Sequence, residues 1–474
     1  MNNAIVRIES ISIHNFKNVV QGSIDLTPKK KGLKASILGL WGQNGSGKTA
    51  LIDAIQLLLY ALQGKSIPVS FADCIHTAAA FSTLSFTFLV QNDIGTYHAT
   101  YTFSIRKEKD ETAQNTITNM DSVTCRICIF NEELKCSFQS GAEKVRVTSI
   151  MDTKTDDIFV PQSKYRLLIG SSKSIATDLL VAKRITAAAS RSFLFSREML
   201  TAIKANRQNT VLSSEFRRYS ELLFNLVTYG NHELFVINTL NSGFIRLNAL
   251  PLAFKYEENH MGVFGSIVVS LEAPTVIPVE AAEVVRKVID SMNLVLQQIV
   301  PGLTIQVLSL GNQLMENGKQ GERIQLVSRK NGNTIPLRYE SEGIKKIVSI
   351  LPLLIDVYNL PSVTLAVDHL DSGIFEYLLG EILRIISEKG KGQLIFTSHN
   401  LRPLETLDKS LIAFTTTNPE NRYVRMVNVK ENNNLRDLYY RDIMLGEQSE
   451  ELYEPTNNSE IALAFHEAGE LSGS

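Results

Sequence analysis

An eight-residue run near the N-terminus, Gly42–Thr49, constrains this sequence more than any other feature. It reads Gly-Gln-Asn-Gly-Ser-Gly-Lys-Thr and fits the pattern G-x-x-x-x-G-K-[ST] without a mismatch. An apolar segment, Ala35–Trp41, precedes it, and a helical pattern over Thr49–Leu62 follows, with apolar residues spaced to form one buried face. Strand, loop and helix in this order predict a loop whose backbone N–H groups bind nucleotide phosphates.

Each position of this loop has an expected role. The glycines let the backbone curl so that successive N–H groups face inward. We expect the Lys48 ammonium to contact the β- and γ-phosphates of ATP, and the Thr49 hydroxyl to bind Mg²⁺. The expected ATP-binding residues of the loop are Gly42, Gln43, Asn44, Gly45, Ser46, Gly47, Lys48 and Thr49.

A phosphate loop of this kind needs a carboxylate that holds the metal ion. The apolar segment Leu365–Asp368 ends in an aspartate, and we expect Asp368 to bind Mg²⁺ together with Thr49. The alternative is an ordinary aspartate that caps a turn at a strand end. The two motifs lie 320 positions apart (368 − 48), which predicts that a long insertion separates two halves of one sheet.

The rest of the pattern predicts an α/β chain. Residues 82–105 alternate with a period of two, and two more strands are expected at Ser122–Phe130 and Lys144–Ser149, which together form an antiparallel meander. An Arg- and Lys-rich stretch, Thr177–Leu226, reads as helical. The last third alternates helix and strand, which is typical of a mostly parallel sheet covered by helices. Its expected elements are Glu342–Tyr358, Val363–Asp368, Phe375–Glu388 and Gly392–Ser398.

Composition excludes several classes of protein. The net charge is −1, so any nucleic-acid contact has to come from a local patch. No apolar run reaches the roughly 18 residues of a membrane span, and four cysteines without a paired framework fit a reducing cytoplasm. Cys125 and Cys128 have zinc-like spacing, but only Cys136 lies near, so buried thiols on a strand are the favoured interpretation.

These motifs together resemble those of the SMC/RecF/RecN class of ABC-type ATPases. The N-terminal resemblance lies in Phe16-Lys17-Asn18, in Trp41–Thr49 and in Leu51–Ile55. The C-terminal resemblance lies in a degenerate signature, Ser341–Lys346, and in the strand that ends at Asp368, followed by a switch histidine, His399. The resemblance covers residues 5–170 and 320–415 and implies an α/β fold. The implied domain is a split ABC-type P-loop ATPase with a mixed sheet, an antiparallel β lobe and a mixed helical insertion lobe.

The resemblance also implies how the site is completed. Two copies would face each other head to tail, and Ser341 and Gly343 of one copy would cap the γ-phosphate bound by the other. Gln162 would be the glutamine that reports on the metal and the attacking water, although a surface glutamine in a loop fits equally well. For Lys17, a solvated lysine is favoured over a phosphate contact.

The chain departs from this class at one catalytic position. The residue after the Walker B aspartate is normally glutamate, which orients or deprotonates the attacking water, and here it is His369. A histidine can accept a proton near neutral pH, but its geometry differs from that of glutamate. We therefore expect ATP binding with slow or absent hydrolysis. Asp371 and Glu376 are the nearby carboxylates that could substitute.

The segment between Gln162 and Ser341 is short and mixed, and the sequence has no long coiled coil. In this the chain resembles the compact ATPases of bacterial anti-phage defence systems such as Septu and PARIS. That resemblance implies a cytoplasmic homo-oligomer, acting as a sensor or scaffold that controls a separately encoded effector, often a nuclease. The alternatives are a RecF-like repair ATPase that binds DNA through Arg184, Arg191 and Arg218, and a chain with nuclease activity of its own.

The expected organisation has four parts. Residues 1–170 form the N-terminal half of the ATPase domain, 171–320 the insertion lobe, 321–446 the C-terminal half, and 447–474 an acidic tail. The tail contains seven glutamates and neither lysine nor arginine.

Overall fold

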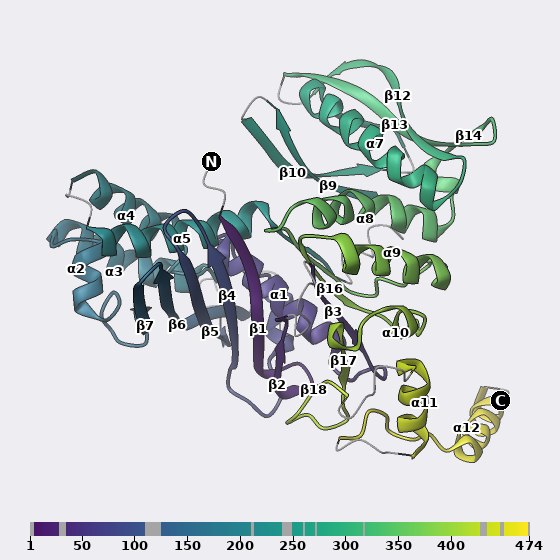
Figure 1. Cartoon of the computed structure of the whole chain (residues 1–474), viewed down its shortest axis with the longest axis horizontal. Coiled ribbons are helices and arrows are strands. Elements are labelled where there is room, and N and C mark those ends of the chain that lie inside the picture. Colours follow the sequence, from purple (N-terminus) through teal and green to yellow (C-terminus); the bar gives the residue numbers. More distant parts are fainter. Residues whose placement is uncertain are drawn as a thin grey trace.

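The computed structural model describes residues 4–472, apart from 28–34, 110–124, 210–212, 239–248, 259–260, 271–272, 316–317, 427–433 and 446–449. Its centre is a six-stranded sheet in the order β18-β17-β3-β16-β15-β8, with β18 antiparallel and the other strands parallel (Figure 1). The strands are β3 (Ser36–Trp41), β8 (Leu234–Ile237), β15 (Thr364–Val367), β16 (Gln393–Thr397), β17 (Ile412–Thr415) and β18 (Tyr423–Val424). Because β3 and β15–β18 come from opposite ends of the chain, the expected split domain is confirmed.

Both faces of this sheet are covered, which is why its parallel strands are apolar throughout. Alternate residues of a strand point to opposite faces. Leu38 and Leu40 of β3 enter one hydrophobic core with helix α1 (Lys48–Leu62), whereas Ile37 and Trp41 enter a second core with helices α8 (Glu342–Asn359) and α9 (Glu376–Lys389).

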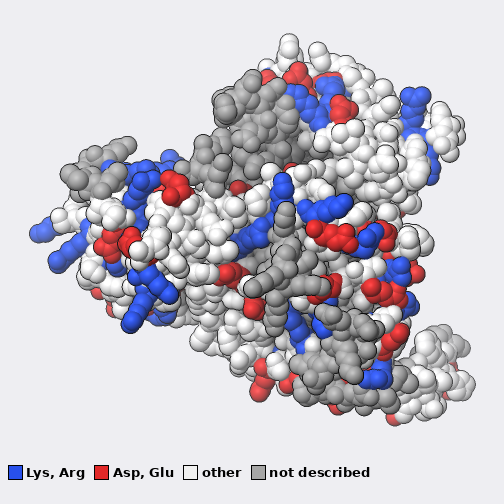
Figure 2. Space-filling view, in the orientation of Figure 1, with Lys and Arg blue, Asp and Glu red and all other residues white. Residues whose placement is uncertain are grey.

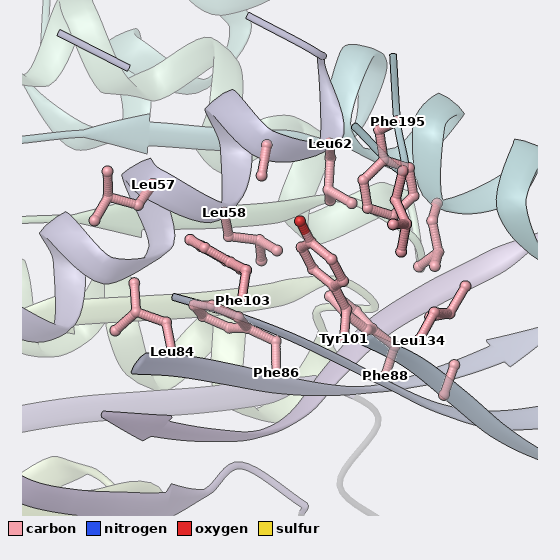
Figure 3. Packing of buried hydrophobic residues seen from close by; sticks show 14 of the residues in the cluster. Leu57, Leu58, Leu62, Leu84, Phe86, Phe88, Tyr101, Phe103, Leu134 and Phe195 are labelled. Atoms are coloured by element: carbon pink, nitrogen blue, oxygen red, sulfur yellow. The ribbon is translucent and has the colours of Figure 1, made fainter. Parts of the chain in front are cut away.

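The first core is closed by a six-stranded antiparallel sheet in the order β2-β1-β4-β5-β6-β7. Its strands are β1 (Ile5–Phe16), β2 (Val19–Asp25), β4 (Ser82–Gln91), β5 (Thr96–Lys109), β6 (Cys125–Ser140) and β7 (Glu143–Asp152). Figure 3 shows Leu57, Leu58 and Leu62 of α1 facing Phe86 and Phe103 of this sheet. The expected meander is present, and the free thiols of Cys128 and Cys136 are buried on β6.

The Arg- and Lys-rich stretch folds into three helices after a short one. These are α2 (Gln162–Leu168), α3 (Lys173–Ala188), α4 (Arg197–Asn209) and α5 (Ser214–His232). Several of the basic side chains hold this region to the antiparallel sheet. Lys183 donates hydrogen bonds to three backbone carbonyls after β7, Arg217 pairs with Asp93, and Arg218 pairs with Glu143.

The middle of the chain forms a lobe above the central sheet in Figure 1. Its elements are β9 (Ala249–Glu258), β10 (Met261–Ser270), β11 (Thr275–Pro278), α7 (Val279–Ile299), β12 (Leu303–Leu314), β13 (Gln320–Lys330) and β14 (Asn333–Pro336). The expected boundary at 320/321 falls at the start of β13, which pairs with β11, β12 and β14. In addition β8, within the expected insertion, belongs to the central sheet, because Thr364–Val367 of β15 pair with it in parallel.

The remaining described elements are four short ones and two C-terminal helices. The short ones are the 3-10 turns η1 (Val69–Cys74), η3 (Leu337–Tyr339) and η4 (Lys409–Leu411) and the one-turn helix α10 (Pro403–Thr406). The two C-terminal helices are α11 (Leu435–Leu445) and α12 (Asn458–Ser472). The expected acidic tail is thus helical over Asn458–Ser472. Among the described residues, no helix is both long enough and apolar enough to cross a membrane.

Candidate functional site

The phosphate loop joins β3 to α1, as predicted, and its glycines carry its shape. Gly42, Gly45 and Gly47 have φ angles of 152°, 78° and 97°, in a region that side chains disfavour. A Cβ at Gly42 would lie 1.8 Å from Oγ1 of Thr415, so this position admits only glycine. At Gly45 a Cβ would meet nothing within 4 Å, which leaves open space above the loop for phosphates.

Lys48 lies buried beneath this loop. Its Nζ donates hydrogen bonds to the carbonyl oxygens of Gly42 and Gln43, at 2.8 and 2.9 Å. Burial lowers the pKa of Lys48 to about 8, and the carboxylates of Asp368 and Asp371 oppose that shift. The loop therefore holds a partly desolvated cation at the place where anionic phosphates would arrive.

Asp368 follows β15 and is fully buried next to the first turn of α1. Its Oδ1 accepts a hydrogen bond from Thr397 Oγ1 at 2.6 Å, and its Oδ2 accepts one from Thr49 Oγ1 at 3.0 Å. A hydroxyl and a carboxylate in contact offer the oxygen ligands that Mg²⁺ takes in P-loop sites. The donor set thus fits a magnesium ion held by Thr49 and Asp368 together with nucleotide phosphates.

Two histidines stack at the edge of this site. The rings of His369 and His399 lie 5.4 Å apart at an interplanar angle of 15°. His369 takes a left-handed conformation, with φ of 50°, and its Nε2 lies 3.7 Å from Oδ2 of Asp368. Burial, followed by the charge of Lys48, lowers the pKa of His399 below its ordinary value. Burial and the neighbouring cation therefore both favour the neutral form of the His399 imidazole.

Two residues of this cluster, Thr397 and Asp371, were not among the residues expected to bind ATP or the metal ion. Thr397 donates to Asp368 and also accepts a hydrogen bond from the backbone N–H of His369, at 2.8 Å. Asp371, one of the two carboxylates that could substitute for the missing glutamate, accepts hydrogen bonds from the backbone N–H groups of His399 and Asn400, at 2.9 and 3.0 Å. The one sequence signal for Thr397 is its position at the end of the strand before His399.

Trp41 connects the phosphate loop to the histidine loop. It is buried one residue before Gly42, and its Nε1 donates a hydrogen bond to the carbonyl of Asn400 at 2.7 Å. Its ring meets Phe396 edge-on, with centroids 5.5 Å apart. A movement of either loop would change the surroundings of this indole.

The expected signature residues open helix α8. Ser341 is its N-cap and accepts a hydrogen bond from the backbone N–H of Ile344 at 3.3 Å. A Cβ at Gly343 would lie 2.0 Å from the carbonyl oxygen of Gly373, so glycine is needed for the loop after β15 to pack against this helix. The contacts described for these two residues are to Ile344 of the same helix and to Gly373 after β15, and none of the described contacts is to the phosphate loop.

Two further expected residues lie elsewhere. Gln162 is the exposed first residue of α2, which Figure 1 places at the far end of the antiparallel lobe, well separated from β3. The structure therefore does not bring Gln162 to the phosphate loop. Lys17, the favoured solvated lysine, forms an ion pair with Asp53 of α1 and is only partly exposed.

A segment near the C-terminus reaches the phosphate loop, which the sequence did not indicate. The backbone N–H of Glu454 donates to Oε1 of Gln43 at 2.9 Å, and Nε2 of Gln43 donates to the carbonyl of Glu454 at 3.5 Å. Leu452 is buried, and the Glu450 carboxylate accepts hydrogen bonds from Asn418 and Asn421. Residues 450–454 are thus fixed beside the loop.

Comparison with known proteins gives one matching family model and several similar solved structures. Residues 10–223 match the family model described as an AAA domain. None of the curated proteins compared with the chain matches it significantly. Similar solved structures include an SMC head bound to the C-terminal winged-helix domain of ScpA, with 13% identity over 88% of this chain and 97% of that one, and a TM-score of 0.38.

Two others are similar to the same degree. The SMC head domain from Thermotoga maritima has 12% identity, with 89% and 99% of the two chains covered and a TM-score of 0.37. The recombination mediator protein RecF with ATP has 14% identity, with 89% and 100% covered and a TM-score of 0.37. At TM-scores this low, the function of the chain is inferred from its own site.

Proposed function

We propose that this chain is an ABC-type ATPase that binds ATP with Mg²⁺ and uses it as a switch. The proposal starts from the match of residues 10–223 to the AAA domain model. The observation that carries the proposal is the convergence of Lys48, Thr49 and Asp368. Thr49 and Asp368 come from opposite halves of the chain, yet their side chains meet at 3.0 Å beside the phosphate loop. A buried carboxylate in contact with the P-loop hydroxyl is the arrangement needed to bind a metal ion and triphosphate.

ATP binding would exchange one set of contacts for another. Lys48 would leave the carbonyls of Gly42 and Gln43 and donate to the β- and γ-phosphates, which restores the environment that favours its charged form. Thr49 and Asp368 would hold Mg²⁺, which neutralises phosphate charge when bound. Ser341 is exposed at the start of α8, so the N-terminus of that helix from a second copy would complete the γ-phosphate site.

Hydrolysis is proposed to be slow or absent. His369 stands where a glutamate would act as the base, and its left-handed backbone and its stacking on His399 hold the imidazole beside Asp368. An imidazole can take a proton from water near neutral pH. It lacks the second oxygen with which a carboxylate orients that water, so ATP would act chiefly as a ligand that stabilises an assembly.

We propose that this switch belongs to a bacterial anti-phage defence system. In it the chain would form a homo-oligomer that acts as a sensor or scaffold and controls a separately encoded effector. Nuclease activity is the first activity for which that effector should be tested. The support is the compact insertion between the two halves of the site. Its described residues form the helices α3 to α5 and the lobe of β9–β14 and α7, and none of these described elements is a long coiled coil. A gene that occurs without a neighbouring toxin or nuclease gene would count against this assignment.

The second candidate is a RecF-like ATPase that binds DNA directly. Of the three arginines expected to contact DNA, Arg184 is exposed. Arg218 is a correction to that expectation, since it is buried, pairs with Glu143 and lies over the ring of Phe138. Charge reversal at Arg184 and Arg191 is therefore the usable test, and it should abolish any salt-sensitive DNA binding if this candidate holds.

The first experiment measures ATP binding through Trp41 emission beside steady-state ATP hydrolysis. Trp41 is the only tryptophan, so the signal is specific to the site. Lys48→Ala should lose the emission change. Binding without turnover supports the switch, and turnover that Lys48→Ala abolishes would show an active hydrolase. No binding in the native chain would refute the proposed function.

A separate assay tests whether the chain is itself a nuclease. Cleavage of DNA or RNA by the purified chain with Mg²⁺ or Mn²⁺ would assign nuclease activity to the chain.

A further inference from the structure

The C-terminal helix α12 stands away from the rest of the chain. Every described side chain from Glu454 to Glu470 is exposed, and Figure 1 shows the helix at the right-hand end of the molecule. Ile461, Ala464, Phe465 and Ala468 recur at the spacing of one helical face, and Phe465 is 78% exposed. An isolated helix of 15 residues is marginal in water, so this apolar face needs a partner.

The base of this helix is held firmly. Leu452 is buried, and Glu454 exchanges two hydrogen bonds with Gln43. The segment before α12 is therefore part of the body, and α12 is presented outward from it.

A matching surface lies at the other end of the molecule, on α3. Leu180, Val181 and Ile185 are 43%, 51% and 52% exposed and form one apolar patch in the C-terminal half of that helix. Lys173 and Arg184 are exposed on the same face. Figure 2 shows lysine and arginine side chains gathered over this end of the molecule.

The two surfaces are similar in extent and opposite in charge. The apolar residues span positions 461–468 on α12 and 180–185 on α3, which is about 10 Å and about 8 Å along the helix axes. Glu460 and Glu467 border the apolar face of α12, and the chain from Glu447 onward has no lysine or arginine. On α3, Lys173 and Arg184 outnumber the one exposed acidic residue, Asp178. Opposite charge beside an apolar patch favours one docking partner over others.

We propose that α12 of one copy packs on α3 of the next copy. The two helices lie at opposite ends of the longest axis in Figure 1, so one chain cannot make this contact with itself. A contact between different surfaces of identical chains is head to tail and repeats, forming a ring where the rotation closes. One helix pair is a small interface, and closure of a ring strengthens it through multivalency. The contact uses no residue of the nucleotide site, so it holds or fails independently of the proposed function.

Two full-length variants test the contact by complementation. Phe465→Asp places a charge on the α12 face and Ile185→Asp places one on the α3 face, both at exposed positions where the fold tolerates polar groups. Sedimentation velocity without nucleotide should show native chain in species larger than a monomer. Each variant alone should self-associate at least tenfold more weakly. An equimolar mixture should form a dimer, because one intact α12 and one intact α3 remain. Leu294→Asp, on the exposed face of α7, is the matched control and should assemble like the native chain.

Several outcomes would overturn the proposal. If the native chain stays monomeric at tens of micromolar, the partner of α12 is a different protein and not a second copy of this chain. Normal assembly of Phe465→Asp would exclude α12, and normal assembly of Ile185→Asp would place α12 on another surface. Failure of the mixture to form a dimer would mean that the contact is not head to tail.

Discussion

The protonation of the Lys48 ammonium depends on whether it contacts the carbonyls of the phosphate loop or bound phosphates. Burial lowers its pKa to about 8 while it is bound to the loop carbonyls, and bound phosphates would raise the pKa again. ATP binding then takes up a proton when the pH exceeds about 8. Affinity should be insensitive to this group below that pH and should fall by up to about tenfold per pH unit above it.

Titration of ATP into the chain at pH 7, 8 and 9 measures this dependence. Lys48→Arg is the control, because a guanidinium stays charged over the whole range. The slope should vanish in that variant. An equal slope in both proteins would assign the pH dependence to another group.

His369 gives a second prediction at the level of one residue. His369→Glu should raise the rate of ATP hydrolysis, since a positioned general base contributes about 10²- to 10⁴-fold. The left-handed backbone at this position, with φ of 50°, costs an L-residue roughly 1–2 kcal/mol, and His369 already carries that cost, so the exchange should change stability by less than this amount. Single-turnover hydrolysis and thermal unfolding report the two effects separately.

His369→Gln is the appropriate comparison, because glutamine has nearly the same shape as glutamate and cannot take the proton. If His369→Glu hydrolyses ATP no faster than His369→Gln, the position after Asp368 is not what limits turnover. The search for a base would then move to Asp371.

At the scale of elements, a buried carboxylate joins β6 to the connection between α3 and α4. Glu132 accepts hydrogen bonds from Tyr101 Oη at 2.7 Å, from Ser192 Oγ, and from the backbone N–H groups of Phe193 and Leu194 at 2.7 and 3.3 Å. Burial raises the pKa of this carboxyl, and the hydrogen bonds oppose that shift. One side chain therefore fixes how the helical region sits on the antiparallel sheet.

Glu132→Ala should lower the free energy of unfolding by about 3–5 kcal/mol, since it leaves several buried donors without an acceptor. Denaturant unfolding measures the loss. Glu133→Ala is the matched control, because the neighbouring carboxylate is also buried but pairs with Lys135 and Lys154, whose side chains are about half exposed. Its loss should be smaller than that of Glu132→Ala, because water can solvate the lysines once the carboxylate is gone. Equal losses in the two variants would contradict a special role for Glu132.

At the scale of the whole molecule, the site draws together segments from almost the full length of the chain. Ser46 of the phosphate loop contacts Thr415 of β17, and Thr49 of α1 contacts Asp368 after β15. A ligand at this point should therefore stabilise the central sheet as one unit. At 100 times the dissociation constant, ATP with Mg²⁺ should add about 2.7 kcal/mol to the free energy of unfolding.

Calorimetry with and without ATP checks this prediction. The main transition should move up by several degrees in the native chain, as expected for about 2–4 °C per kcal/mol in a large domain. Lys48→Ala should show no shift. A shift confined to a minor transition would mean that the nucleotide stabilises only a local segment.

The sequence by itself determined the phosphate loop, the strand that ends at Asp368 and the split α/β fold. These features depend on contiguous residues and on the order of elements, which periodicity and glycine spacing reveal. Only the tertiary structure decided which distant groups meet. It brought Thr397 to Asp368, Asp371 to the backbone of His399, and Glu454 to Gln43, because such contacts depend on how strands stack and carry no local pattern.

The same reason explains the corrections. Arg218 and Lys183 look like members of a basic helical surface in the sequence, and the structure buries or ties them against the antiparallel sheet. Glycine at position 343 could be read from a motif, but its immediate physical need, the close approach of Gly373, appears only in the folded chain. The sequence shows which chemical groups are present and in what local order, whereas the packing of the folded chain decides which of these groups contact each other.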